Sequence, residues 1–315
     1  MDQLALARVP FFFMFDFLMQ QSIVCPEDSL EEKGLFIDFP NFTNTKTKDT
    51  SSKKTLEIKA FPEDLAAYQK GFEIVQNHLK QGNSYLVNYT RKTPIELNLS
   101  LEEIHLRAKA KYKIYYKDRF VCFSPETFVE INNDVISTHP MKGTIDAAKP
   151  DAAQQLKNNP KEKAEHYTVV DLLRNDLSTV ADHVQVVDFQ RIDYLETNRK
   201  NLFAMSSEIK GVIKPEYQNK IGSLMRNLLP AGSILGAPKP KTLQIVLEAE
   251  KYNRGWYSGV SGWFDGKNLD SCVMIRFIEK ENNRFFFKSG GGLTHQSQLQ
   301  EEYEEMKNKI YVPVY

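Results

Sequence analysis

A lysine beside a glycine is the first feature of this sequence that could do chemistry. Lys142 lies in the segment PMKGT (residues 140–144), just after a predicted strand. In a tight turn the backbone can approach a ligand closely, and an amine whose pKa is lowered by burial or by a neighbouring positive charge is a nucleophile. A solvated surface lysine fits the same five residues, so the segment alone leaves both interpretations open.

A carboxylate between two predicted strands is the second such feature. Glu126 ends the segment SPE (residues 124–126). A carboxyl group in a site can give a proton to a leaving group or take one from an attacking group. Glu126 is therefore a candidate general acid or base, although a turn with a solvated carboxylate fits SPE equally well.

Two pairs of glutamates suggest a metal site. Glu162 and Glu165 are three residues apart in one predicted helix, and Glu302 and Glu305 are three apart in another. Residues at this spacing share a helix face. If the two faces met, their oxygen atoms would suit a hard divalent cation, Mg²⁺ before Zn²⁺. Two solvated helix faces are the alternative, and no histidine spacing typical of zinc enzymes occurs.

Glycine-rich segments could bind an anion. The segment GSILGAPK (232–239) precedes a predicted helix, and Gly290, Gly291 and Gly292 follow a predicted strand. Exposed backbone N–H groups in such turns, above all at the start of a helix, hold phosphate or carboxylate. Neither segment contains the GKS, GKT or GxGxxG pattern of nucleotide sites. Turns that bind nothing fit these residues as well.

The spacing of apolar residues predicts the elements that must position these side chains. A stripe at helical spacing over residues 65–79 predicts a helix that ends before Gly82, and Ser100 with Glu103 predicts a capping box. Further predicted helices cover 160–180, 216–228, 238–251 and 297–310, and predicted strands cover 9–17, 35–39, 84–90, 119–139, 184–188, 202–209, 256–264, 269–278 and 284–288. Because the strands come in adjacent runs, we predict an α+β protein with antiparallel sheets flanked by helices.

Composition narrows the class of protein. The chain has 315 residues with 41 basic and 41 acidic side chains, so its formal charge is zero. Nucleic acid and anionic membranes select clustered positive charge, and we expect neither as a partner. Three separated cysteines suit a reducing compartment, and no apolar run approaches the roughly 18 residues that span a bilayer. We expect a cytoplasmic protein with a short N-terminal segment (1–58), including a mobile loop (41–54), before a main domain (59–315).

Taken in order, several motifs resemble the chorismate-utilising enzyme family, and within it the branch that forms 4-amino-4-deoxychorismate. The resemblance covers about residues 62–315. Besides SPE and PMKGT it rests on KEKAEH (161–166), VDLLRNDLSTVA (170–181), LPAGSILGAPK (229–239), RGWYSGVSGW (254–263), VMIRF (273–277), GGG (290–292) and the glutamate-rich last helix. One of these motifs alone would be weak, whereas the ordered set is specific.

This resemblance implies two stacked, largely antiparallel β-sheets with outer helices, and chorismate as a substrate that binds with Mg²⁺. Lys142 stands where this branch carries lysine and where anthranilate synthases typically carry alanine. The implied reaction begins with attack of Lys142 on C2 of chorismate while Glu126 protonates the leaving 4-hydroxyl. Ammonia then adds at C4 and expels the lysine, which gives a precursor of 4-aminobenzoate and folate.

The resemblance also assigns binding residues. Glu165 and Glu305 are expected as direct ligands of Mg²⁺, and Glu162 and Glu302 as ligands directly or through water. The positions that match substrate contacts are Gly143, Thr144, Gly236, Ala237, Tyr257, Arg276, Gly290, Gly291, Gly292 and Lys309. A bidentate contact between Arg276 and a carboxylate is the strongest of these on physical grounds. Ammonia is expected from a separate glutamine amidotransferase subunit, since this sequence has no glutaminase signature.

Some positions depart from the family pattern. Leu86 follows Tyr85 where glutamine is frequent, and Ile145-Asp146 replaces the usual arginine after Gly143-Thr144. The N-terminal portion is shorter than in typical relatives, so we do not expect a complete tryptophan pocket. Ala204 stands where anthranilate synthases carry histidine, which disfavours that activity.

Three alternatives remain open. An anthranilate synthase component I-like enzyme is the nearest, and Lys142 distinguishes the two activities. Isochorismate- or salicylate-forming relatives place a lysine base near residues 85–87, where this sequence has none. A non-catalytic subunit that binds chorismate or an amidotransferase is the alternative of a different class, and the presence of Lys142, Glu126 and both glutamate pairs argues against it.

Overall fold

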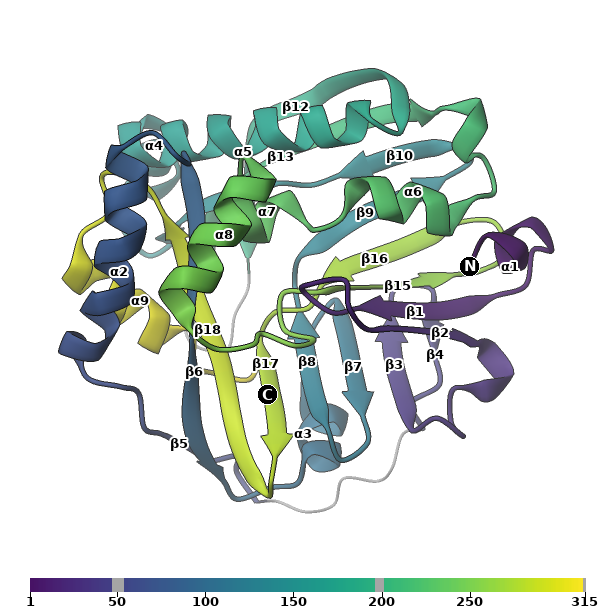
Figure 1. Cartoon of the computed structure of the whole chain (residues 1–315), viewed down its shortest axis with the longest axis horizontal. Coiled ribbons are helices and arrows are strands. Elements are labelled where there is room, and N and C mark those ends of the chain that lie inside the picture. The colour runs from purple at the N-terminus through teal and green to yellow at the C-terminus, as the bar shows by residue number, and fades with distance from the viewer. Residues whose placement is uncertain (47–53, 196–200, 314–315) are drawn as a thin grey trace. The chain divides into compact units, whose positions relative to one another are not determined.

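The computed structural model describes residues 1–46, 54–195 and 201–313 (Figure 1). Helices and antiparallel strands form the predicted α+β fold with two sheets. The chain divides into two compact units. The first unit comprises residues 1–11, 127–233 and 264–271, and the second comprises residues 12–126, 234–263 and 272–315. The sequence-based division into an N-terminal segment (1–58) and a main domain (59–315) is a different division of the chain, and it stays a prediction.

The first unit is built on a long hairpin. Strand β13 (Leu202–Ile213) pairs with β12 (Ala181–Leu195), with β10 (Val135–Thr138) and with β11 (Met141–Asp146), and β10 also pairs with β9 (Thr127–Asn132). The helices and the 3-10 turn of this unit are α1 (Asp2–Leu6), α4 (Ala152–Asn158), α5 (Pro160–Ser178), η2 (Pro215–Tyr217) and α6 (Ile221–Leu228).

The second unit contains one complete sheet. Its strand order is β14-β6-β18-β17-β8-β7-β3-β4, and β5 pairs with β6. These strands are β3 (Leu35–Phe39), β4 (Phe42–Thr43), β5 (Ile58–Ala60), β6 (Leu86–Leu97), β7 (Tyr112–Tyr116), β8 (Phe120–Ser124), β14 (Gly236–Ala237), β17 (Phe277–Glu281) and β18 (Arg284–Leu293). The remaining elements are β2 (Ser22–Pro26), η1 (Glu27–Ser29), α2 (Leu65–Lys80), α3 (Leu101–Arg107), α8 (Lys239–Glu250) and α9 (Leu299–Asn308). The chain passes from one unit to the other within β1 (Phe11–Phe15), α7 (Gly232–Leu235), β15 (Val260–Phe264) and β16 (Leu269–Val273), and between β8 and β9.

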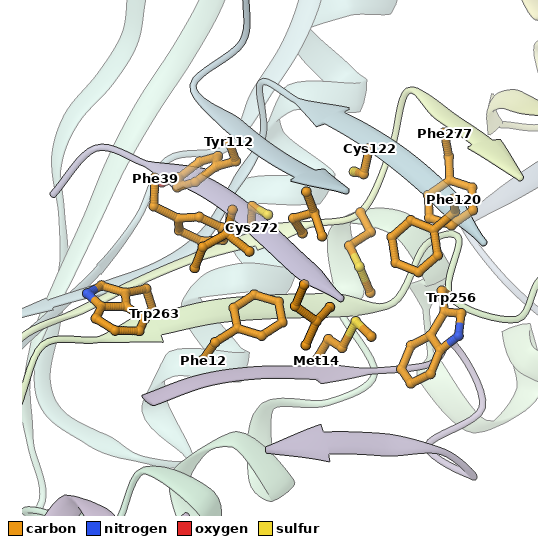
Figure 2. Close-up of a cluster of buried hydrophobic side chains, with 14 of the residues drawn as sticks. Phe12, Met14, Phe39, Tyr112, Phe120, Cys122, Trp256, Trp263, Cys272 and Phe277 are labelled. Carbon is orange, nitrogen blue, oxygen red and sulfur yellow. The ribbon is translucent and has the colours of Figure 1, made fainter. Parts of the chain in front are cut away.

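Buried aromatic and sulfur-containing side chains form a core cluster of the second unit. Figure 2 shows this cluster, with Phe12, Phe120, Trp256 and Phe277 among its fully or nearly fully buried members. The rings of Phe120 and Phe277 stack with centroids 4.6 Å apart. Burying one such side chain contributes about 1.5–3 kcal/mol, so the cluster fixes β7, β8 and β17 together.

Local signals in the sequence placed two helices well. The predicted helix over residues 65–79 is α2, whose first turn is capped by the Asp64 side chain, which accepts from the Ala67 N–H at 2.8 Å. Ser100 and Glu103 form the predicted capping box of α3. Of the predicted loop 41–54, residues 47–53 lie outside the described residues. Phe42 belongs to β4, and its ring stacks on the ring of Trp263 with centroids 3.8 Å apart.

Several predicted boundaries were wrong, and glycine is the main reason. Gly290, Gly291 and Gly292 were predicted to form a turn, but they lie inside β18 and pair with β6. The segment at 140–144 was predicted to be a turn and is largely strand β11. The predicted strand 269–278 is interrupted at residues 274–276, and the predicted helix at 216 begins at Ile221. Within the described parts of the chain, no helix is long and apolar enough to cross a membrane.

Candidate active site

Lys142 lies on a bulge in strand β11 of the first unit. Met141 pairs with Ser206 and Thr144 pairs with Ala204, so Lys142 and Gly143 together stand opposite a single residue of β13. A bulge of this kind re-aims the side chains on the bulged strand. Gly143 has a φ of +79°, a conformation that side chains with a Cβ rarely adopt. The backbone conformation at residue 143 therefore accounts for a glycine next to the candidate nucleophile Lys142.

The carboxylate of Glu162 lies directly above this bulge. A Cβ added to Gly143 would stand 2.6 Å from Oε2 of Glu162, so the missing side chain leaves room for the carboxylate. The N–H of Glu162 donates to Oδ1 of Asn159 at 3.2 Å, which fixes the first turn of α5. Gly143 of the bulge and Glu162 of α5 are therefore neighbours, and the roles assigned to Lys142 and Glu162 stay predictions. Glu165 lies one turn further along α5, half-buried.

His166 is a member of this cluster that the sequence analysis did not single out. Its ring is fully buried, and Nε2 is 2.7 Å from Oγ of Ser207. Ser207 in turn donates its backbone N–H to the carbonyl of Pro140 at 3.0 Å, immediately before the bulge. Burial is the main cause that lowers the pKa of His166 to about 4, and the nearby charge of Lys142 acts in the same direction. The amine of Lys142 is therefore within electrostatic reach of this ring.

The second unit brings the other glutamate pair against a glycine strand. A Cβ added to Gly291 would lie 3.2 Å from Oε1 of Glu305 and 3.4 Å from Oε2 of Glu302. Glu302 is only 6% exposed. Lys309 bridges helix and strand, since its Nζ is 2.6 Å from Oε1 of Glu305 and donates to the carbonyl of Gly290 at 2.8 Å. These predicted residues therefore form one cluster.

Two predicted glycine segments flank the same strand. Gly236 of β14 pairs with Val87 of β6 on one side, and Gly292 of β18 pairs with Asn88 on the other. A side chain at Gly236 would collide with the carbonyl oxygen of Leu86. These glycines allow three backbones to approach closely, and they present peptide groups rather than side chains.

A buried ion pair supports this strand, and the sequence analysis missed it. One carboxylate oxygen of Glu250 accepts from the Thr90 N–H at 2.7 Å, from the Thr90 hydroxyl at 2.8 Å and from Arg254 at 2.6 Å. Arg254 also donates to the carbonyl of Asn88 at 2.6 Å. Although burial alone would lower the pKa of Arg254, Glu250 raises it above its ordinary value. The i, i+4 spacing of the pair was the available signal, but it does not reveal burial.

Tyr257 and Arg276 are neighbours within the second unit. Tyr257 is buried, and its burial raises the pKa of the phenol to about 12, although the charges of Arg254 and Arg276 act in the opposite direction. Arg276 has a φ of +53°, in the left-handed region. Its guanidinium lies over the ring of Tyr311, 5.0 Å from the centroid. Non-glycine residues in this region of φ often mark functional sites.

Glu126 is fixed through its backbone. Its N–H donates to the Ser124 hydroxyl at 3.1 Å, and its carbonyl accepts from the Val273 N–H at 3.1 Å. The side chain is half-buried. Because Glu126 belongs to the second unit and Lys142 to the first, their joint role stays a prediction.

The two predicted glutamate pairs lie in different units, Glu162 and Glu165 in the first and Glu302 and Glu305 in the second. Within the part of the chain that the structure describes, no group of three or more His, Cys, Asp and Glu side chains could hold a metal ion. The donor chemistry nevertheless suits magnesium, because Glu302 and Glu305 both direct an oxygen toward Gly291, where a side chain would otherwise stand. Mg²⁺ stays a prediction.

Comparison with known proteins identifies the family. A model of the chorismate binding enzymes matches residues 16–314. The chain is 48% identical to an uncharacterized PabA-like protein of Pasteurella multocida over 99% of this chain and 97% of that protein. It is 28% identical to aminodeoxychorismate synthase component 1 of Bacillus subtilis over 80% of this chain and 55% of that protein.

A solved structure agrees with these sequence matches. Anthranilate synthase component I from Streptococcus pneumoniae superposes with a TM-score of 0.69 at 25% identity, covering 82% of this chain and 59% of that chain. This protein belongs to the chorismate binding enzyme family. The match begins at residue 16, so the resemblance extends further toward the N-terminus than the motifs alone indicated.

Proposed function

We propose that this protein is an aminodeoxychorismate synthase component I, which converts chorismate and ammonia to 4-amino-4-deoxychorismate for 4-aminobenzoate and folate synthesis. The observation that carries the proposal is Lys142 on its bulge, beside Gly143 and Glu162. A bulge lets the backbone aim a lysine side chain out of the regular alternation of its strand, and an amine aimed at the substrate is what a covalent lysine mechanism needs.

In the first step Lys142 acts as the nucleophile. The neutral amine bonds to C2 of chorismate, the ring double bonds shift, and the bond from C4 to its hydroxyl breaks. Hydroxide is a poor leaving group, so the departing oxygen needs a proton. Glu126 is the proposed donor, and water leaves.

In the second step ammonia replaces the lysine. Its nitrogen bonds to C4, the bond between C2 and Nζ of Lys142 breaks, and the lysine returns as a free amine. Glu126 takes up the proton that the incoming nitrogen loses. The sum is chorismate plus ammonia giving 4-amino-4-deoxychorismate and water, with both residues restored.

Binding residues of the second unit are proposed to hold the substrate carboxylates. Arg276 presents a planar guanidinium that suits a bidentate contact, and Gly290 to Gly292 offer backbone groups. Mg²⁺, held by Glu165 and Glu305 with Glu162 and Glu302 directly or through water, would neutralise the C1 carboxylate of chorismate. Thr144, Ala237, Tyr257 and Lys309 complete the proposed contacts.

The anthranilate synthase reaction is the second candidate, because the solved structure reported above has that name. Lys142 and Ala204 argue against it, since the resemblance associates alanine and histidine at these positions with anthranilate formation. A separate glutamine amidotransferase subunit is the proposed source of ammonia.

Free ammonia makes the proposal testable without a partner. Purified protein is given chorismate, Mg²⁺ and a range of ammonium concentrations at alkaline pH, and products are separated by chromatography and identified by mass. We expect chorismate consumption that rises with ammonium and yields 4-amino-4-deoxychorismate. Anthranilate as the product would favour the second candidate. No consumption at any ammonium concentration would favour a binding subunit.

A further inference from the structure

The side chain of Arg276 is held by the face of one aromatic ring. Its guanidinium carbon is 5.0 Å from the ring centroid of Tyr311. Within residues 1–46, 54–195 and 201–313, the guanidinium has no hydrogen bond and no carboxylate partner. Stacking uses the face of a guanidinium and leaves its N–H edge for a planar, bidentate contact with a carboxylate.

The backbone of Arg276 is fixed from strand β8. Its carbonyl accepts from the Phe123 N–H at 3.0 Å, and the carbonyl of Ile275 accepts from the Cys122 thiol at 3.1 Å. These contacts hold Arg276 at its φ of +53°. The backbone fixes where the side chain starts, but a long arginine side chain keeps several rotatable bonds, so its end needs a second support.

Tyr311 is itself fixed on both sides along the chain. It follows α9, and its N–H donates to the carbonyl of Lys309 at 3.0 Å. Two residues later the carbonyl of Pro313 accepts from the Lys109 N–H at 2.8 Å. The stretch after α9 is therefore attached to the segment that follows α3, two residues beyond Tyr311.

We propose that Tyr311 is a positioning residue that orients Arg276 for the carboxylate of the substrate. The ring face selects one direction of the guanidinium before the substrate arrives, so less side-chain entropy is lost on binding. The inference rests on the proposed function, because that function makes the ligand a carboxylate. No position assigned from the motifs includes Tyr311. Its role follows from the contact with Arg276 alone.

The test is a comparison of chorismate binding by calorimetry and of steady-state kinetics with ammonium. Tyr311→Leu, with Tyr311→Met as a second variant of similar volume, removes the ring face. We expect the Kd and KM for chorismate to rise about threefold to tenfold, since stacking of this kind is modest in energy. The value of kcat should change less than about twofold. Tyr311→Phe keeps the ring and should recover most of the affinity.

A double-mutant cycle separates positioning from general structure. If Tyr311 acts through Arg276, Tyr311→Leu has no further effect on the Kd once Arg276→Ala is present. Tyr116→Leu is the matched control, because Arg119 lies over the Tyr116 ring at 5.3 Å. That control should leave the Kd for chorismate unchanged while removing a similar contact between an arginine and a tyrosine.

The outcomes distinguish this inference from the proposed function. Wild-type protein that binds chorismate but forms no amine product would contradict the proposed function alone, and the variants would still decide the role of Tyr311. Additive effects of Tyr311→Leu and Arg276→Ala, or equal losses from Tyr311→Phe and Tyr311→Leu, would overturn the inference. Wild-type protein that does not bind chorismate would overturn both.

Discussion

Strand β11 of the first unit and strand β18 of the second each place a glycine against an acidic helix, yet the two strands are built differently. Gly291 lies in β18, a central strand of its sheet, in a part of the strand that pairs in regular register with β6. Gly143 lies on a bulge in β11, an edge strand that pairs with β13 alone among the described strands, beside Met141, which is 43% exposed. The second unit thus sets the carboxylates of α9 against a regular strand, whereas the first unit carries Lys142 on an irregular edge strand.

This difference has a physical logic. A binding frame for a charged ligand gains most from groups that do not move, and the buried pair of Glu250 and Arg254 fixes the strand beside β18. A nucleophile must instead project from the backbone toward the reacting carbon, which a bulge permits. The contrast between a regular strand and a bulged strand leads to three predictions.

Substitution of the glycines gives the largest expected effect. In Gly290→Ala the new Cβ would collide with the Tyr89 carbonyl and stand 2.6 Å from Cα of Thr90, so backbone must move. We expect a loss of about 3 kcal/mol in the free energy of unfolding, measured by urea denaturation. Gly143→Ala strains one φ by about 1–2 kcal/mol, and the Glu162 carboxylate can swing aside. Equal losses in the free energy of unfolding for Gly290→Ala and Gly143→Ala would contradict the difference between the two strands.

Substitution of a proposed magnesium ligand is expected to have an effect of intermediate size. Glu302→Gln removes one charged oxygen donor beside Gly291, and we expect the Mg²⁺ concentration for half-maximal activity to rise about 10–100-fold. Glu301→Gln on the same helix is the matched control and should leave the requirement unchanged. If both variants need the same Mg²⁺ concentration, Glu302 is not a ligand of the metal. If the wild-type protein is fully active in excess chelator, the reaction does not depend on a metal ion.

Loss of a hydrogen bond next to the edge strand β11 is expected to have the smallest effect on stability. Asp193 accepts from the hydroxyl of Ser206, the residue opposite Met141. Burial alone would raise the pKa of Asp193, but hydrogen bonds from Arg191 and Ser206 lower it below its ordinary value. Because the folded pKa is lowered, the stabilisation is present above the ordinary pKa of about 3.9 and is lost as pH falls through the folded value.

The corresponding variant is Asp193→Asn. We expect it to lower the free energy of unfolding by about 1 kcal/mol at neutral pH, in urea titrations, and by less as the pH approaches 3. A penalty that stays constant down to acidic pH would show that the charge of Asp193 does not support β11.

The sequence predicted the elements whose signals are local. The stripe of α2 and the capping box at Ser100 depend on neighbours within a few residues, and both are confirmed. The glycines at 290–292 misled because glycine usually marks a turn, whereas here it permits close approach of the strands. That reason is visible only when Thr90 and Tyr89 are placed beside them.

The candidate site followed the same rule. Lys142 and the glutamates could be named from motifs, since residue type and order carry that information. His166 and Tyr311 could not, because their importance comes from contacts with Ser207 and Arg276, far away in the sequence. Long-range pairing of this kind has no periodic signal.

The proposed covalent step depends on one side chain, so its sharpest test is the ammonium-dependent reaction of Lys142→Ala, with Lys142→Arg as a variant that replaces the amine by a guanidinium. Without a nucleophile at this position, formation of 4-amino-4-deoxychorismate should fall by at least about 10³-fold in both variants. Diversion of Lys142→Ala toward anthranilate would also agree with the account. The same product formed at the wild-type rate would contradict it.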